Sequence, residues 1–324
     1  MKVVVTGGCG FIGSNYVRGL LEGRWGTIPT QVTVIDVLTY AGNIANLDPV
    51  IGDARLTLHT VDINETQKVT DIISGHDVVV HFAAESHVDR SITDSGGFIR
   101  TNVLGTQSML QACLVSAVPQ FVHVSTDEVY GSIAHGSWDE QEPLLPNSPY
   151  AASKAGSDLV ARSYYRTYGL DVRITRCSNN FGAYQFPEKA IPLFITNLIE
   201  GKKVPLYGDG LNIRDWLHVD DHCNAIDLVV QKGRAGETYN IGGGTELNNR
   251  ELTTMILSGM GHGDEMIDWV EDRLGHDRRY SVNWTKIHDE LGYTPQHSIA
   301  ESMPHIIDWY RSNPQWWQPL KAKK

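Results

Sequence analysis

The sequence predicts an α/β protein built on a doubly wound parallel sheet, with a smaller mixed α/β domain toward its C-terminus. Three observations lead to this fold class. Short β-branched runs alternate with helical patterns through the first half, several of the runs are apolar almost throughout, and a glycine-rich turn follows the first run. Strands without polar alternation are typical of parallel sheets that helices cover on both faces.

The individual elements follow from this alternation. The expected strands are Val3–Thr6, Gln31–Asp36, Leu56–Thr60, Asp77–Phe82, Phe121–Ser125 and Asp171–Arg176. The expected helices between them are Gly13–Glu22, Thr66–Ser74, Phe98–Ser116 and Pro149–Tyr168. The third helix carries an apolar stripe, formed by Phe98, Ile99, Val103, Leu104, Met109 and Leu110. A further strand and helix near Leu217–Gln231 are expected to return to the sheet.

Composition excludes several classes of protein. The formal net charge of the 324 residues is -11, which argues against general nucleic-acid binding because phosphate backbones need clustered Lys and Arg. There is no apolar run long enough for a membrane span and no pattern of a secretory signal at the N-terminus. The four cysteines are scattered, so we expect reduced thiols, no metal site and a cytoplasmic location.

A glycine-rich loop follows the first strand. Gly7, Gly10 and Gly13 have G-x-x-G-x-x-G spacing between a predicted strand and a predicted helix. Glycines at this place let the backbone turn tightly and approach a pyrophosphate, which then lies at the helix N-terminus. The loop therefore predicts a dinucleotide site in a Rossmann-type domain.

The ends of the next strands supply the other candidates for cofactor binding. Asp36 ends the second strand at about the 20-residue distance expected of the acid that binds the adenosine ribose. Its carboxylate would repel the 2′-phosphate of NADP, so NAD is expected. Asp62 and Ile63 end the third strand, where an adenine ring could lie, and the small Ala83 and Ala84 end the fourth.

Tyr150 and Lys154 form a Y-x-x-x-K pair on the predicted helix Pro149–Tyr168. The i, i+4 separation places both side chains on one face of the helix. We expect the ammonium of Lys154 and a cationic nicotinamide to lower the pKa of the Tyr150 phenol towards neutrality. Tyr150 could then serve as a general base toward a sugar hydroxyl.

The fifth strand ends in Ser125, Thr126, Asp127 and Glu128. Adjacent carboxylates couple, and burial favours a single shared proton between them. Such a pair could supply one acid and one base. Together with the glycine loop and the Tyr–Lys pair, these residues resemble the extended short-chain dehydrogenase/reductase family. The similarity runs through LTYAGN, HFAAESHVDRSI, STDEVYGS, SPYAASKA, TRCSNNFG, PEKAIPLF, PLYGDGLNIRDWLHVDDH and NIGGG.

Within that family the resemblance is strongest to members that remove water from dTDP-glucose. It implies that Tyr150 takes the proton of the 4-hydroxyl, with Thr126 hydrogen-bonded to that hydroxyl and Lys154 on the cofactor ribose. It also implies that Glu128 removes the carbon 5 proton and that Asp127 protonates the departing 6-hydroxyl. NAD is regenerated in each cycle, so it is expected to stay bound. The product is a 4-keto-6-deoxy sugar nucleotide.

The resemblance also implies two sets of binding residues and a division into domains. For NAD they are Gly7, Gly10, Phe11, Ile12, Gly13, Asp36, Thr39, Asp62, Ile63, Phe82, Ala83, Ala84, Ser86, Thr101, Tyr150, Lys154 and Asn180. For the nucleotide sugar they are Ser86, Thr126, Asp127, Glu128, Asn179, Lys189, Ala190, Pro205, Leu206, Tyr207, Arg214, Asn249, Arg273, His276 and Tyr280. The expected NAD-binding domain is 1–182 with 217–242, and the nucleotide-sugar domain is 183–216 with 243–324. A homodimer through helices 98–116 and 149–168 is also implied.

Three alternatives remain at this point. A sugar-nucleotide 4-epimerase of the same family would share the loop, Tyr150 and Lys154, but needs no acid–base pair such as Asp127 and Glu128. A GDP-mannose 4,6-dehydratase would perform the same chemistry on another base and sugar. A non-catalytic NAD-binding scaffold would be expected to lose Tyr150 or Lys154, and this chain has both.

Overall fold

A seven-stranded, wholly parallel sheet forms the larger part of the computed structural model, which describes residues 1–322. The strand order is β10-β6-β5-β4-β1-β2-β3. The bounds are β1 Lys2–Thr6, β2 Gln31–Asp36, β3 Leu56–Thr60, β4 Val78–His81, β5 Gln120–Thr126, β6 Asp171–Cys177 and β10 Thr238–Ile241. The predicted fold class is confirmed, and the six strands predicted in the first half lie within two residues of their expected ends.

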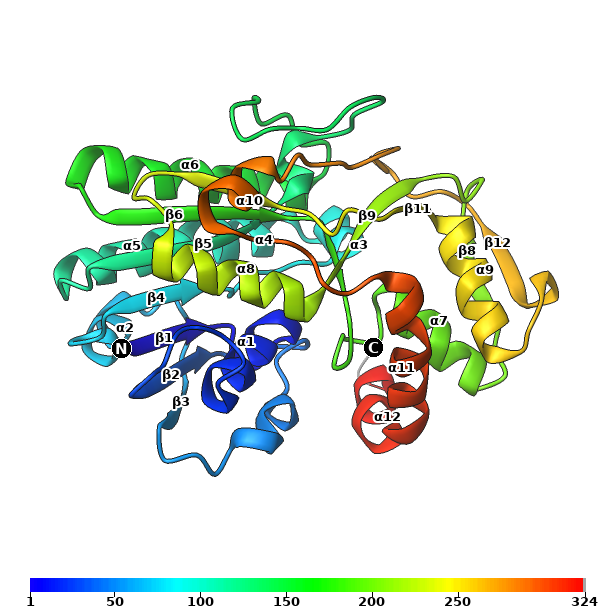
Figure 1. Ribbon diagram of the computed structural model, residues 1–324, viewed down its shortest axis with the longest axis horizontal. Helices are drawn as coiled ribbons and strands as arrows, with labels where there is room; N and C mark the ends of the chain where they lie inside the picture. Colours follow the sequence, from blue (N-terminus) through cyan, green and yellow to red (C-terminus); the bar gives the residue numbers. More distant parts are fainter. Residues whose placement is uncertain (323–324) are drawn as a thin grey trace.

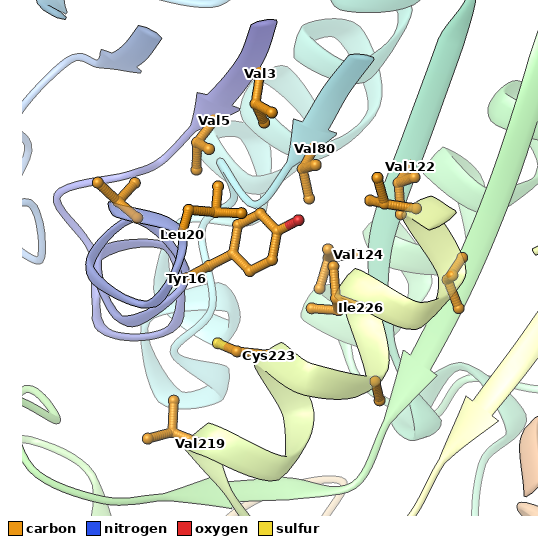
Figure 2. Close-up of a cluster of buried hydrophobic side chains, with 14 of the residues drawn as sticks. Val3, Val5, Tyr16, Leu20, Val80, Val122, Val124, Val219, Cys223 and Ile226 are labelled. Carbon is orange, nitrogen blue, oxygen red and sulfur yellow. The ribbon is translucent and has the colours of Figure 1, made fainter. Parts of the chain in front are cut away.

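Helices cover both faces of this sheet. Helices α1 (Phe11–Glu22) and α8 (Val219–Lys232) pack on one face, where Tyr16 and Leu20 meet strand residues such as Val5 and Val80 (Figure 2). Helices α2 (Thr66–Ile73), α5 (Gly105–Val115) and α6 (Pro149–Tyr168) pack on the other. Neighbouring strand residues alternate between the two cores, which explains the apolar runs in the sequence.

Two sequence predictions about this part need correction. The helix expected at 98–116 is interrupted, because α4 (Ser95–Phe98) leads into a π-helical turn, η2 (Ile99–Leu104), before α5 begins. The strand that contains Leu217 is β9 (Ile213–His218), and it belongs to a small separate sheet. The strand that returns to the large sheet is β10, after α8, where it pairs with β6.

The remaining elements form a second layer of structure beyond one end of the sheet (Figure 1). A three-stranded sheet has the order β11-β9-β7, with β7 Asn179–Phe181 and β11 Glu246–Asn248, and β8 (Val204–Tyr207) pairs with β12 (Ile267–Val270). Helices α7 (Ala190–Ile199), α9 (Asn249–Met260), α11 (Ile299–Ser312) and α12 (Pro314–Ala322) enclose a second core around Phe194, Ile256 and Trp317. The domain boundaries themselves stay a prediction.

Short elements connect these parts. They are η1 (Ile44–Val50), α3 (Val88–Thr93), η3 (Asp127–Tyr130), η4 (Asp264–Met266) and α10 (Thr285–Leu291). Among residues 1–322, none of the helices combines the length and the apolar character that crossing a membrane requires. All four cysteines are buried with free thiols, as the sequence predicts.

Candidate active site

A cavity of about 380 Å³ lies at the carboxyl ends of the parallel strands. The sheet order reverses between β1 and β4 there, and open α/β sheets bind ligands at such a point. All the residues predicted to bind NAD line this one cavity. Six of the residues predicted to bind the sugar nucleotide also line it: Ser86, Thr126, Asp127, Glu128, Asn179 and Lys189.

The glycine loop has the shape that a bound pyrophosphate requires. Gly7 has a φ of +65°, and a Cβ on it would lie 2.7 Å from the backbone nitrogen of Ala83. A Cβ on Gly13 would lie 2.3 Å from the carbonyl oxygen of Gly7. Helix α1 begins after Gly10 without a side-chain cap, so its first N–H groups remain available to an anion. These features fit a dinucleotide.

Asp36 is held against the same loop. Its Oδ2 accepts a hydrogen bond from the Cys9 backbone N–H at 2.9 Å, and its Oδ1 accepts one from Leu38 N–H at 2.8 Å. Burial raises the pKa of Asp36, and these two hydrogen bonds oppose the shift. The carboxyl group thus orients the loop while it lines the cavity, a placement that suits the predicted contact with a ribose.

Tyr150 and Lys154 lie on the first turns of α6, where Ser148 caps the helix by accepting the Ala151 N–H at 3.1 Å. The Lys154 ammonium donates to the carbonyl of Val124 at 2.8 Å, and burial lowers its pKa to about 8. The expected low pKa of Tyr150 is not found in this structure. Burial and the nearby Glu128 carboxylate raise it well above the usual value.

Asp127 and Glu128 lie in different surroundings although they are neighbours in the chain. Asp127 is 2% exposed, and its Oδ2 has no hydrogen-bond partner among the described residues. Burial, followed by the carboxylates of Glu128 and Asp215, raises the pKa of Asp127 well above its usual range. Of the two carboxyl groups, Asp127 is the one whose surroundings favour the protonated form more strongly.

Glu128 is partly exposed to the cavity, and cations surround it. Desolvation raises its pKa, but Arg273, Arg214 and Lys189 all act in the opposite direction. The Tyr280 hydroxyl also lies 3.4 Å from Glu128 Oε2. Desolvation outweighs these cations, so the pKa of Glu128 is raised, but the shift is opposed by three cations that Asp127 lacks in this combination. Environments that differ in this way are what one acid and one base require.

Nine of the residues predicted to bind the sugar nucleotide lie outside the lining of this cavity. They are Ala190, Pro205, Leu206, Tyr207, Arg214, Asn249, Arg273, His276 and Tyr280. Ala190 is exposed at the start of α7, and Leu206 is buried in the second core. Arg214, Arg273 and Tyr280 nevertheless approach Glu128 from the far side. Their roles in binding stay a prediction.

Several lining residues were missed from the sequence. Cys177 and Ser178 directly precede Asn179, and Glu188 directly precedes Lys189, so adjacency to a predicted residue was an available signal. Trp316 and Leu320 also line the cavity, and they come from α12 at the opposite end of the chain. No local pattern connects them to the glycine loop.

One group among the described residues brings together three potential metal ligands: His218, Asp220 and His297. The two imidazole rings stack with centroids 4.5 Å apart and an interplanar angle of 26°. Imidazole lone pairs lie in the ring plane, so stacked rings do not converge on one ion. Asp220 Oδ1 already accepts from Arg24 at 2.8 Å. This arrangement is a hydrogen-bonded contact rather than a metal centre.

One family model and three known proteins are similar to this chain over almost its whole length. The model for GDP-mannose 4,6 dehydratase matches residues 4–306. The dTDP-glucose 4,6-dehydratase of Streptomyces antibioticus is 59% identical over 325 residues, 100% of this chain and 96% of that protein. DesIV, the dTDP-glucose 4,6-dehydratase of Streptomyces venezuelae solved with NAD and a dTDP ligand, is 58% identical with a TM-score of 0.98, covering 99% of this chain and 100% of that one. The enzyme of the same name from Bacillus anthracis, in complex with NAD, is 45% identical with a TM-score of 0.91, covering 99% of each chain.

Proposed function

We infer the function from one premise: the chain belongs to the extended short-chain dehydrogenase/reductase family, in the group that the GDP-mannose 4,6 dehydratase model describes. On that basis its cavity binds NAD and dTDP-glucose. The reaction is dTDP-glucose 4,6-dehydration, which yields dTDP-4-keto-6-deoxyglucose and water. Carbon 4 is oxidised and carbon 6 is reduced, so the reaction needs no net oxidant.

The observation that carries this proposal is the asymmetric carboxyl pair beside Tyr150. An elimination needs one group that accepts a proton and another that donates one. The pKa of the buried Asp127 is raised well above its usual range, whereas three cations offset part of the desolvation that raises the pKa of Glu128. Both side chains line the same cavity as Tyr150 and Thr126.

The residues divide the proton transfers among them. NAD, when bound, supplies the acceptor and donor of the hydride and a positive charge beside Tyr150. Tyr150 accepts the proton of the 4-hydroxyl, with the Thr126 hydroxyl next to it. Glu128 accepts the carbon 5 proton, which the 4-ketone has made acidic. Asp127 then gives its proton to the departing 6-hydroxyl, which leaves as water.

The alternatives are distinguished by this same pair. A 4-epimerase needs only the oxidation and its reversal, and it gives no role to a protonated Asp127. A scaffold protein gives no role to a buried Lys154 that is fixed beside Tyr150. Preference for dTDP over GDP is supported by the relatives that share more than half of this sequence.

The test is turnover of a panel of nucleotide sugars in deuterated water. With dTDP-glucose we expect a 4-keto product, deuterium at carbon 5 and no net NADH. Inversion at carbon 4 without deuterium would instead identify an epimerase. Preferential turnover of GDP-mannose would instead identify a GDP-mannose 4,6-dehydratase.

A homodimer is also part of the proposal. Ile99 and Leu104 on η2 and Leu159 on α6 are 46%, 55% and 59% exposed, and these two helices pack side by side. Burial of this apolar face against a second copy would form a four-helix contact. We expect Leu159→Glu to give a monomer in light scattering. Leu211→Glu, at another exposed leucine, is the control and should leave the oligomer unchanged.

We also propose a cytoplasmic location. The support is that all four cysteines are free and buried, as is usual in a reducing compartment. Cell fractionation with compartment markers tests this, and recovery outside the cytoplasmic fraction would contradict it.

A further inference from the structure

Helix α12, the last helix of the chain, reaches the cavity that the glycine loop opens. Trp316 and Leu320 line this cavity together with Gly7 and Gly10, although some 300 residues separate the two segments. Trp316 is 9% exposed. The C-terminal helix therefore completes a wall of the site that the N-terminal half of the chain begins.

A chain of hydrogen bonds connects α12 to the loop. Trp316 Nε1 donates to Asn46 Oδ1 at 2.8 Å, and Asn46 Nδ2 donates to the carbonyl of Cys9 at 2.9 Å. Cys9 N–H in turn donates to Asp36 Oδ2 at 2.9 Å. The indole of α12 is thus two hydrogen bonds away from the backbone of the glycine loop, and three from the acid expected to hold the ribose.

Asn46 is fixed so that it can serve as this connector. It is 2% exposed on η1, and its carbonyl accepts from Arg18 Nη1 at 2.6 Å. The Arg18 guanidinium lies over the ring of Tyr184 at 4.3 Å. Tyr184 meets the Trp316 ring edge-on at 5.6 Å, so packing and hydrogen bonds hold the same contact.

The opposite face of α12 is anchored in the second core. Trp317 Nε1 donates to the carbonyl of Tyr310 on α11 at 2.8 Å. Lys321 Nζ donates to Asn197 of α7 and to Glu200, the residue that follows α7, at 2.9 Å each. Helix α12 is therefore held on one side by α7 and α11, and on the other by Asn46. Movement of α12 away from the cavity would have to break the Trp316–Asn46 bond.

We propose that α12 is a clamp that retains the dinucleotide, and that Trp316 is a positioning residue which keeps it closed through Asn46. This inference rests on the proposed function, because a cofactor that is regenerated in each cycle has to remain bound between turnovers. The clamp slows release of NAD without touching the groups that move protons. Its effect is thus on cofactor retention and not on the chemical steps.

The test measures NAD release from holoprotein loaded with radiolabelled NAD and chased with excess unlabelled NAD. Trp316→Phe keeps an aromatic ring but removes the bond to Asn46, and we expect release to be about five- to tenfold faster, as for one buried hydrogen bond. Trp317→Phe is the matched control, since it removes an indole bond on the same helix that does not lead to the loop. We expect it to release NAD within about twofold of the parent.

The proposal is overturned if Trp316→Phe releases NAD at the parent rate, or if Trp317→Phe accelerates release equally. Asn46→Ala removes the same bond from the other side, and it decides the matter if Trp316→Phe does not fold. Turnover of dTDP-glucose by the parent protein is measured separately. Faster release of NAD from Trp316→Phe together with an inactive parent protein would support the clamp and contradict the proposed reaction.

Discussion

Paired substitutions at the two carboxyl groups test which of them holds the proton. Asp127→Asn exchanges a neutral buried acid for a neutral amide of the same shape. The amide keeps an Oδ1 that accepts from the Thr126 hydroxyl, 3.3 Å away, and the changed atom is at the Oδ2 position. We expect the free energy of unfolding to change by no more than about 0.5 kcal/mol at a pH below 3.8, where the carboxyl group is protonated in both the folded and the unfolded protein.

Glu128→Gln should show a smaller change. Desolvation also raises the pKa of Glu128, but Arg273, Arg214 and Lys189 offset part of that shift. The penalty that Glu128 imposes on folding at neutral pH is therefore smaller than that of Asp127, and we expect Glu128→Gln to stabilise the protein less than Asp127→Asn does.

The pH dependence of the free energy of unfolding tests the assignment of Asp127 independently. The pKa of Asp127 is raised in the folded protein. The group therefore opposes folding increasingly as the pH rises above 3.8, which is the pKa of the carboxyl group in the unfolded chain. Asp127→Asn removes this penalty. The stability of the variant relative to the parent should thus increase from acidic to neutral pH.

Both variants should lose turnover by about 10²–10⁴-fold, which is the usual contribution of a general acid or base. Oxidation at carbon 4 should continue in each of them, so enzyme-bound NADH absorbance should accumulate after dTDP-glucose is added. Urea unfolding and stopped-flow absorbance measure the two effects. If Glu128→Gln gains more stability from acidic to neutral pH than Asp127→Asn does, the proton belongs to Glu128 and the assignment of acid and base is reversed.

Two further predictions concern the loop and the core. Gly7→Ala should abolish NAD retention and cost about 2–4 kcal/mol of stability, because φ is +65° and the added Cβ meets Ala83 N at 2.7 Å; Gly52→Ala, where no heavy atom lies within 4 Å, is the control in the same thermal melts. Burial lowers the pKa of His123 to about 4 and that of His222 to about 3. The unfolded chain therefore binds two more protons than the folded one as the pH falls from 6.5 toward 4, and the free energy of unfolding should drop by up to about 3 kcal/mol per pH unit. Equal urea midpoints at neutral and mildly acidic pH would contradict this assignment.

The features that were predicted from the sequence are those that depend on residues close together in the chain. Each strand of the large sheet from β1 to β6 has a local apolar run, and the glycine spacing between Gly7 and Gly13 reflects contacts within one turn. Asp127 and Glu128 were identified because they directly follow a buried strand. In all these cases the residues that create the feature lie within a few positions of one another.

Local patterns of this kind do not predict contacts between segments that are distant in the sequence. β10 pairs with β6 although the two are separated by β7, β8, β9 and two helices, so no neighbouring run indicates its place in the sheet. Trp316 joins the cavity only because α12 packs beside η1, a contact that neither segment encodes alone. The π-helical turn η2 was also missed, because periodicity does not separate a π turn from an α-helix over six residues.

The different surroundings of Asp127 and Glu128 follow from the local backbone. Thr126 ends β5 and caps η3, since its hydroxyl accepts the Glu128 N–H at 3.3 Å. A 3₁₀ turn has about three residues per turn, so consecutive side chains diverge by roughly 120°. Both side chains line the cavity, but Asp127 is thereby the more deeply buried, while Glu128 lies near the Tyr280 hydroxyl. Two neighbouring carboxyl groups acquire different surroundings, and with them different tendencies to hold a proton, because the strand ends in this turn.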